Sequence, residues 1–484
     1  MTLNNLKSVQ KLLGTLVMLF SFTLLLPFIV SSIDSDINTA SSFLQSFFYT
    51  LIAGCLLWFP SRSAGTDIRL HEGFIIVALF WIILALFGSI PFLVLPASSL
   101  TITDAIFEST SGLTTTGATV MSNLDVIPKG LLFYRAQLQW LGGLGIVVLA
   151  VAIMPLLGVG GMRLYKADSA SSVSDTKLNP RQKETAKSLG KIYLALTLAC
   201  IVCFKIAGMP FFDAICHGLT TVAIGGFSTH DASFGFYQGN AQIFWVASVF
   251  MILAGINFSL HFFAWKNKTL SNYLMDSEFK AYASLLLVVV LFSGLALMSG
   301  DNLTSFSELF FQVVSIGTTT GFTSSGYYQW PTFIPFLLLM LSFVGGCVGS
   351  TGGGLKVTRC LILLKQGLKE AKQLIHPNAE IPVKINKQSV DQNILDSVWG
   401  FVSVYIIVLV CFTLAMLATG MDVVTSFSSV AASLNNLGPG LGDVMVNYQD
   451  LLTLPKWICI AAMVLGRLEI FALLILFHPS FWQD

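Results

Sequence analysis

Ten long apolar segments constrain the fold of this chain more than any other feature of its sequence. The first follows Lys11 and ends near Ser32, and the others cover approximately residues 43–60, 73–95, 134–157, 189–209, 241–264, 281–299, 332–354, 396–419 and 457–477. A helix of about 20 apolar residues crosses the hydrocarbon core of a bilayer. Of the whole chain 55% is hydrophobic and only 11% is charged, whereas soluble domains have about 25% charged residues. The sequence excludes a soluble protein and predicts an all-helical membrane protein with about ten transmembrane helices.

A short pattern recurs four times between these segments. Each copy begins with an acidic or polar residue, continues with about ten mildly apolar residues and ends in a polar stretch. The last residue of the stretch is a glycine, thirteen residues after the first position. The first positions are Asp104, Asp213, Glu308 and Thr425. The four stretches are Thr114, Thr115, Thr116 and Gly117; Ala223, Ile224, Gly225 and Gly226; Thr318, Thr319, Thr320 and Gly321; and Asn435, Asn436, Leu437 and Gly438. Each apolar part is too short to cross a membrane, so each copy is predicted to be a re-entrant loop.

The repeat divides the chain into five parts. Residues 1–70 are predicted to form two N-terminal transmembrane helices, because the first apolar segment lacks the cleavage site of a signal peptide. The four repeats of span, re-entrant loop and span are predicted at residues 71–165, 166–275, 276–390 and 391–484. They are expected to surround one pore with pseudo-fourfold symmetry.

The charged residues are distributed unevenly about these spans. If the N-terminus lies inside, most of the 26 basic residues fall on inner segments and only Lys129 and Lys456 fall on outer ones. Cytoplasmic segments carry such an excess, so both termini are predicted to be cytoplasmic. The outer segments are acidic, which favours the approach of cations, although acidic loops also arise for topological reasons alone.

The four loops have the composition of a cation filter. Backbone carbonyl groups replace the water shell of a monovalent cation without fixed charge. Glycine permits the backbone angles that such a loop needs, threonine hydroxyls add acceptors, and the C-terminal end of the short helix before each loop carries partial negative charge. A single such segment would be an ordinary turn, but four copies in register predict a pore. No covalent chemistry, covalent cofactor or nucleic-acid partner is expected.

A glycine-rich run interrupts the second span of the third repeat. Its members are Gly345, Gly346, Gly349, Ser350, Thr351, Gly352, Gly353 and Gly354. Six glycines in ten residues do not form a stable helix, and irregular backbone at this depth occurs only inside protein or along a watery cavity. A flexible helix junction is the simpler alternative. Leu355 stands where a nucleotide-binding loop needs lysine.

Arg467 lies near the centre of the last span. A charge there costs about 2.5–3.5 kcal/mol on insertion scales and usually faces a cavity or a partner. We expect it to donate hydrogen bonds to carbonyl groups of the glycine-rich run, either as a purely structural contact or in a role in which it also repels a passing ion. Glu469, two positions away, falls on a different helix face. Arg135 and Lys205, nearer the outer ends of their spans, are expected to snorkel or to pair with acids of the short helices.

The four loops together resemble those of the Trk/Ktr/HKT superfamily of potassium transporters. The resemblance covers about residues 70–484, and the two extra N-terminal spans are similar to the bacterial Trk branch. It implies potassium as the transported ion, the four loops as its binding site and selectivity filter, and the glycine-rich run as an intramembrane gate. It also implies a homodimer in the lipid of the bacterial inner membrane and a cytoplasmic nucleotide-binding regulatory ring that is TrkA-like. Plant members that select sodium have serine at the first filter position, where this chain has Gly117, and this favours potassium.

Two other functions remain open from the residues alone. A symporter that couples potassium to protons or sodium would need ionisable residues along its path, and apart from Arg467 and Glu469 the span centres offer almost none. A receptor without a conduction path would not need four glycine loops in register.

Overall fold

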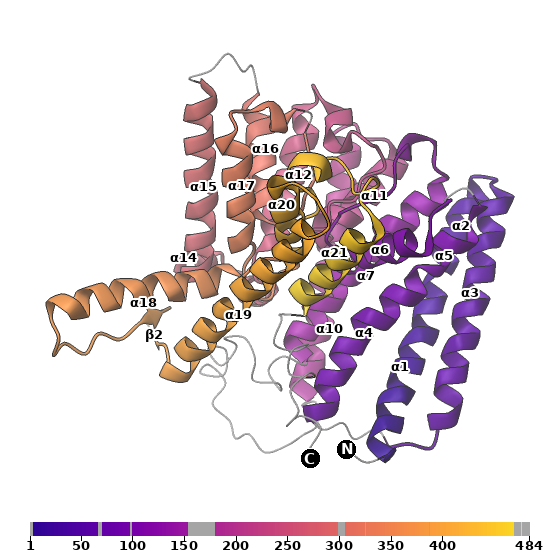
Figure 1. Ribbon diagram of the computed structural model, residues 1–484, viewed down its shortest axis with the longest axis horizontal. Coiled ribbons are helices and arrows are strands. Elements are labelled where there is room, and N and C mark those ends of the chain that lie inside the picture. The colour runs from indigo at the N-terminus through magenta and orange to yellow at the C-terminus, as the bar shows by residue number, and fades with distance from the viewer. Residues whose placement is uncertain are drawn as a thin grey trace.

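Helices make up nearly all of the described chain, and most of the long ones run in broadly the same direction, with α18 (Val357–Ile375) running across it (Figure 1). The structure is a computed structural model that describes residues 3–65, 70–96, 99–152, 180–298, 305–324, 326–386, 388–468 and 476. Within these residues the strands are β1 (Lys384–Ile385) and β2 (Gln388–Ser389), which pair antiparallel with Lys384 opposite Ser389. The prediction of an all-helical fold is confirmed, apart from this hairpin.

The N-terminal part forms a closely packed group of helices. It comprises α1 (Leu3–Thr23), α2 (Leu25–Ile33), α3 (Ile37–Trp58) and the 3-10 turn η1 (Phe59–Ser61). A Cβ atom on Gly14 of α1 would lie 2.7 Å from the backbone nitrogen of Trp58, so glycine allows α1 and α3 to approach closely. A Cβ atom on Gly130, in the next part of the chain, would overlap the Ser31 hydroxyl. This close contact attaches the N-terminal group to the rest of the molecule.

Four short buried helices occupy the middle of the molecule. They are α6 (Ile102–Leu113), α11 (Phe211–Ala223), α16 (Phe306–Gly317) and α20 (Val423–Leu434). The N-terminus of α6 is capped by Thr101, that of α16 by Ser305 and that of α20 by Asp422, each through its side chain. These caps satisfy backbone N–H groups that a helix end leaves free. Each predicted re-entrant segment is therefore a helix that stops within the molecule.

Other helices flank each short helix in the chain. Those before the short helices are α4 (Leu70–Gly88) with α5 (Ile90–Val94), α10 (Pro180–Ile206), α15 (Ser277–Met298) and α19 (Gln392–Leu417). Those after are α7 (Lys129–Ala152), α12 (Ala241–Gly255) with α13 (Phe258–Asn267), α17 (Phe333–Val344) and α21 (Thr453–Arg467). The connections from each short helix to the helix that follows it contain the 3-10 turns η3 (Leu124–Val126), η4 (Ser233–Tyr237), η5 (Tyr327–Gln329) and η6 (Gly442–Val444).

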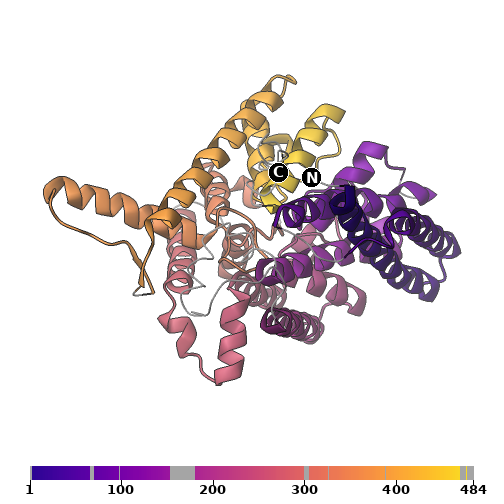
Figure 2. The ribbon, with the colours of Figure 1, turned by 90° about the horizontal axis from the view of Figure 1, so that it is seen from below.

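The packing of these helices is cyclic. Each helix that follows a short helix also packs on the next short helix along the chain: α7 on α11, α12 on α16, α17 on α20, and α21 back on α6. From below, consecutive parts of the chain accordingly surround a common centre (Figure 2). The last contact, from α21 to α6, closes the ring.

Seven of the ten predicted spans are helices long and apolar enough to cross a membrane within the described residues. The segment 241–264, predicted as one span, is a pair of helices, α12 and α13, that meet at a bend of 93°. Asn257 caps α13 by accepting a hydrogen bond from the Ser259 backbone at 2.8 Å, so a new helix begins there. In the segment 332–354 the helix α17 ends at Val344. The helix α21 ends at Arg467, and Glu469 lies outside the described residues.

One helix extends away from the bundle. The helix α18 (Val357–Ile375) begins after the glycine-rich run and projects sideways with the β1–β2 hairpin (Figures 1 and 2). The short helix α14 (Ser271–Met275) connects α13 to α15 near the same end of the bundle.

Candidate functional site

The glycines that end the four loops form a closed ring. Each glycine lies against the residue that precedes the glycine of the next loop. A Cβ atom on each glycine would overlap or crowd a carbonyl oxygen of the next loop, namely Gly117 against Gly225, Gly226 against Thr320, Gly321 against Leu437, and Gly438 against Thr116. In each case the carbonyl belongs to the residue immediately before the partner glycine. The structure therefore brings all four predicted loops together, in chain order, at one place.

The four short helices end in the same hydrogen-bond pattern. The backbone N–H of the residue before each glycine donates to the carbonyl five residues earlier: Thr116 to Ser111, Gly225 to Thr220, Thr320 to Ser315, and Leu437 to Ala432, at 2.8–2.9 Å. The preceding residue donates to the carbonyl three residues earlier in every copy. These are the two bonds of a Schellman motif. The C-terminal end of every short helix consequently lies directly before the ring.

The position that closes each motif has a left-handed backbone. Its φ is +52° at Thr115, +54° at Ile224, +67° at Thr319 and +53° at Asn436. Branched residues rarely adopt this conformation, and each such residue costs about 1–3 kcal/mol. The same geometry at equivalent positions indicates that the ring imposes one backbone path on threonine, isoleucine and asparagine alike.

The ring offers oxygen atoms and no formal charge. In the first and third loops, hydroxyl pairs lie 2.7 Å apart, Thr114 with Thr116 and Thr318 with Thr320. In the fourth loop, Nδ2 of Asn436 donates to Thr116 Oγ1 at 3.0 Å, which joins the last loop to the first. Within the described residues no group of three or more His, Cys, Asp or Glu is placed to hold a metal ion. A cation at the ring would be surrounded by carbonyl and hydroxyl oxygens.

A polar side chain within each short helix forms a hydrogen bond with the chain segment that follows its loop. Glu108 accepts a hydrogen bond from the Val120 backbone at 3.0 Å, and Gln312 accepts one from Ser324 at 2.9 Å. His217 contacts the Ser228 hydroxyl at 3.0 Å, and the Ser428 hydroxyl accepts from the Leu441 backbone at 2.8 Å. The first three supporting residues lie nine positions before the glycine of their loop and Ser428 lies ten before Gly438, and the chemistry of the support differs in each quarter.

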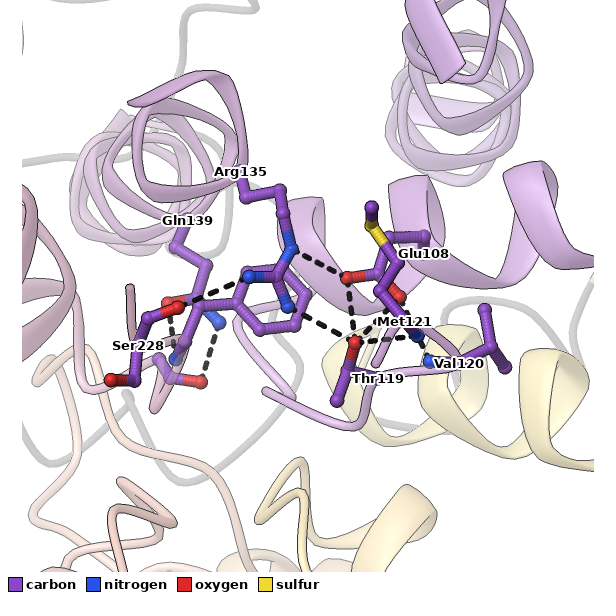
Figure 3. Close-up of polar contacts among 9 residues, drawn as sticks. Glu108, Thr119, Val120, Met121, Arg135, Gln139 and Ser228 are labelled. Atoms are coloured by element: carbon purple, nitrogen blue, oxygen red, sulfur yellow. Dashed lines mark hydrogen bonds and ion pairs between the residues drawn. The ribbon is translucent and has the colours of Figure 1, made fainter. Parts of the chain in front are cut away.

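Only the first of these supports carries a charge, and a buried arginine balances it (Figure 3). Arg135 on α7 donates to Glu108 through Nε at 2.8 Å and to the Thr119 hydroxyl through Nη2 at 3.0 Å. Its Nη1 reaches across to the Ser228 carbonyl in the second loop at 3.1 Å. Both charged side chains are at most 1% exposed. Of the two alternatives for Arg135, pairing with an acid of a short helix is the one observed, while Lys205 is exposed.

Gln139 holds the second loop from the same helix, and sequence reasoning missed it. Its Nε2 donates to the Gly225 carbonyl at 2.5 Å, and its Oε1 accepts from the Phe227 backbone at 3.1 Å (Figure 3). Gln139 is fully buried. A polar amide inside an apolar span was the available signal, because a buried amide needs partners.

His230 joins three outer elements beside the ring. It contacts Asp125 through Nδ1, lies 3.4 Å from Asp213 through Nε2, and stacks on Phe236. Burial alone would lower the pKa of His230, but the hydrogen bonds and charges of Asp213 and Asp125 outweigh it and raise the pKa above its usual value. His230 thus links the connection that follows the first loop to the second short helix.

The glycine-rich run lies against the ends of three of the four short helices. The Gly353 backbone donates to Thr319 Oγ1 at 2.7 Å, and Gly354 donates to the Asn435 carbonyl at 3.1 Å. The Thr351 hydroxyl donates to the Val222 carbonyl at 3.1 Å. The run therefore lies beside the ring, on the side where the short helices end.

Arg467 reaches the run from the fourth quarter of the molecule. Its Nη1 donates to the Thr351 carbonyl at 3.1 Å, and the side chain is 4% exposed. Gly466 beside it lies against the Leu434 carbonyl, where a Cβ atom would clash. The expected hydrogen bond between Arg467 and the glycine-rich run is present.

The glycine-rich run is also held by helices on the side away from the ring. Glu278 at the start of α15 accepts a hydrogen bond from the Val348 backbone at 2.7 Å. The Cys347 backbone donates to the Gly255 carbonyl at 2.9 Å, and the Phe258 backbone donates to the Gly349 carbonyl at 3.1 Å. The bend between α12 and α13 is therefore a contact surface for the run, which explains why α12 stops where it does.

Comparisons with known proteins agree with this geometry. The family model described as "TrkH: Cation transport protein" matches residues 39–484. The chain is 48% identical over 482 residues to the Trk system potassium uptake protein TrkH of Salmonella typhimurium and 47% identical to that of Escherichia coli K12, with 99% of each chain covered. It superimposes on the crystal structure of the potassium transporter TrkH from Vibrio parahaemolyticus with a TM-score of 0.92 at 46% identity, covering 99% of both chains.

The buried ion pair generates a prediction about stability. Arg135→Gln leaves Glu108 charged and buried without its cation, and we expect a loss of about 3–5 kcal/mol. The double variant with Glu108→Gln should lose less than the sum of the two single losses. Thermal unfolding of the purified protein in detergent measures the effect, with Lys205→Gln as the exposed control. Equal unfolding temperatures for Arg135→Gln and the control would contradict it.

Proposed function

Because the chain belongs to the TrkH family of cation transport proteins, we propose that it takes up potassium ions through a pore whose filter is the ring of four loops. The observation that carries this proposal is the closed ring of glycines and carbonyl groups. Carbonyl oxygens from several directions replace the hydration shell of a monovalent cation. Potassium is here the transported substrate, and no resident cofactor is required.

The electrostatics of the ring support a cation. Four helix C-terminal ends stand directly before it, and each carries about half a negative charge. The ring itself has no charged side chain, so an ion is attracted without being trapped by a fixed charge. A pore must hold the ion strongly enough to strip its water and weakly enough to release it.

The glycine-rich run is proposed to be the gate. It contacts the loops at Thr319 and Asn435 on the side away from the outer mouth, and a backbone with so much glycine can change its path at little steric cost. Within the described residues, Nε and Nη2 of Arg467 have no hydrogen-bond partner. A buried guanidinium beside the run repels a cation and ties the run in place through Thr351.

The orientation and partners belong to the same proposal. We place the protein in the bacterial inner membrane as a homodimer, with both termini in the cytoplasm and a TrkA-like nucleotide-binding ring below it. The relatives in Salmonella and Escherichia coli are described as parts of a Trk system. The projecting α18 and its lysines supply a basic surface on the side where basic residues gather.

Growth of a cell that lacks its own potassium uptake systems tests the proposed activity. Expression of this chain should restore growth at low potassium. Failure to do so, with the protein present in the membrane, would argue against uptake.

The filter assignment predicts a change in selectivity. A side chain at Gly226 would collide with the Thr320 carbonyl of the next loop, so Gly226→Ser should distort the ring and raise the sodium-to-potassium permeability ratio severalfold. Reversal potentials in planar bilayers measure this ratio. Gly367→Ser is the matched control, because nothing lies within 4 Å of its Cβ position. An unchanged ratio in Gly226→Ser would remove this residue from the filter.

The gate assignment predicts a change in basal flux. Deletion of several residues within 348–353 should raise rubidium uptake into proteoliposomes that lack the regulatory ring, and Arg467→Ala should raise it more modestly. Since Arg467 and Thr351 share one contact, the two effects should be less than additive. Lys205→Ala is the control for loss of a positive charge. Uptake at or below the unaltered level in a monodisperse deletion variant would show that the run is not the barrier.

The docking assignment predicts a loss of partner binding. Charge reversal of Lys365, Lys369 and Lys372 on α18 should weaken co-purification of the nucleotide-binding ring, because the basic surface becomes acidic. Lys365 already donates to the Lys384 carbonyl at 2.6 Å, so Lys369 and Lys372 should account for most of the loss. Reversal of Lys187 on α10 serves as the control. Co-purification that survives the reversal would indicate that these lysines contact lipid headgroups.

A further inference from the structure

A cavity of about 630 Å³ opens between α10, α13 and the turn that leads to α14. One wall is apolar and includes Ile192 and Leu196 of α10. Trp265, Lys268, Thr269 and Tyr273 line the other side. The cavity thus combines a hydrocarbon surface with a polar, basic end, and it is separate from the ring and the glycine-rich run.

The helix that forms this cavity lies across the bundle direction. Because α13 is bent by 93° from α12, a membrane-spanning α12 places α13 along the membrane surface. Trp265 is 71% exposed and Leu270 is 75% exposed, and Lys266 and Lys268 are their neighbours. Apolar and aromatic side chains beside lysines are typical of helices that lie in the interface of a bilayer.

The charge of the cavity comes from Lys268. His261 also lines it, but its Nε2 is 2.9 Å from the Leu253 carbonyl and its Nδ1 is 2.8 Å from the Tyr273 hydroxyl. A carbonyl only accepts, so Nε2 carries a proton, and the Tyr273 hydroxyl is able to donate to Nδ1 of a neutral ring. Burial lowers the pKa of His261 below its usual value, which favours the neutral ring. The nearby Asp276 is occupied by the Phe279 backbone and the Asn386 amide. Among the described lining residues, Lys268 is then the only formal charge.

We propose that this cavity binds one anionic phospholipid from the leaflet on the basic side of the membrane. An acyl chain packs along Ile192 and Leu196, and the phosphate takes hydrogen bonds from Lys268 and Thr269. Basic pockets between membrane helices on the cytoplasmic side bind acidic headgroups in this manner. The match of a cationic end to a hydrocarbon wall distinguishes a phospholipid from free phosphate, which would gain nothing from the apolar side.

The position of the site suggests what the lipid does. Phe258, the first residue of α13, donates its backbone N–H to the Gly349 carbonyl of the glycine-rich run. A lipid that fixes α13 therefore also fixes one contact of the run. This step rests on the proposed gate, whereas the binding site does not.

Native mass spectrometry of the purified full-length protein tests the site directly. With added palmitoyl-oleoyl phosphatidylglycerol, we expect one tightly retained lipid that the phosphatidylcholine analogue does not replace. Lys268→Glu should weaken retention at least about tenfold, since a hydrogen bond to a charged group contributes roughly 1.5 kcal/mol or more. Lys280→Glu is the matched control, because Lys280 is exposed on α15 outside the cavity.

Three results would overturn the binding site. Equal losses in Lys268→Glu and Lys280→Glu would indicate only general attraction to an acidic surface. Equal retention of phosphatidylcholine would exclude recognition of the headgroup. A change from dimer to monomer in Lys268→Glu, with lipid retention unchanged, would make this face an interface between copies of the chain.

Rubidium uptake separates this inference from the proposed function. In vesicles of phosphatidylcholine with and without one-fifth phosphatidylglycerol, uptake should depend on the anionic lipid, and Lys268→Glu should remove the dependence. If the lipid is retained but uptake does not depend on vesicle composition, the proposed link between the lipid and the glycine-rich run is overturned. No uptake in either vesicle would count against the transport function and leave the binding result intact.

Discussion

The contact between each glycine and the carbonyl group of the next loop is the constraint on which the rest of the structure depends. Four main-chain segments meet there, with no room for a Cβ atom at Gly117, Gly226 or Gly321. Such an approach holds only if every helix end is fixed, and the repeated Schellman motifs and the cyclic packing of α7, α12, α17 and α21 provide that support. The left-handed residues before the glycines are the energetic cost of this arrangement.

The backbone of the ring is close to fourfold, but its side chains are not. The first two loops are joined by Arg135 and Gln139, which reach Ser228 and Gly225 from one helix. The first and fourth loops are joined by a single amide, that of Asn436. On the inner side the glycine-rich run touches the second, third and fourth short helices, and Arg467 comes from the fourth part of the chain. Stiffness and charge are therefore distributed unevenly around one ring.

Much of this organisation was predictable from the sequence, because glycine spacing and apolar length are local signals. The four loops, the break after Val344 and the contact of Arg467 with the run all follow from such signals. The bend at Gly255 to Asn257 does not, since the apolar residues continue through Phe262 and Phe263 and no helix-breaking run marks the turn. The left-handed threonines and Ile224 oppose their own conformational preference, and only the assembled ring makes them necessary. Gln139 was overlooked because its two partners are far away in the sequence.

The presence of all four loops in one polypeptide has a consequence for how such a pathway changes during evolution. In a channel of four identical subunits, one substitution appears four times around the axis, so each change is large and symmetric. Here Glu108, His217 and Gln312 occupy corresponding places with different chemistry, and Ser428 makes the comparable contact from one position earlier in its helix. A single mutation alters one quarter of the ring and leaves three in place. Selection can therefore adjust this ring in small steps that a symmetric assembly cannot take.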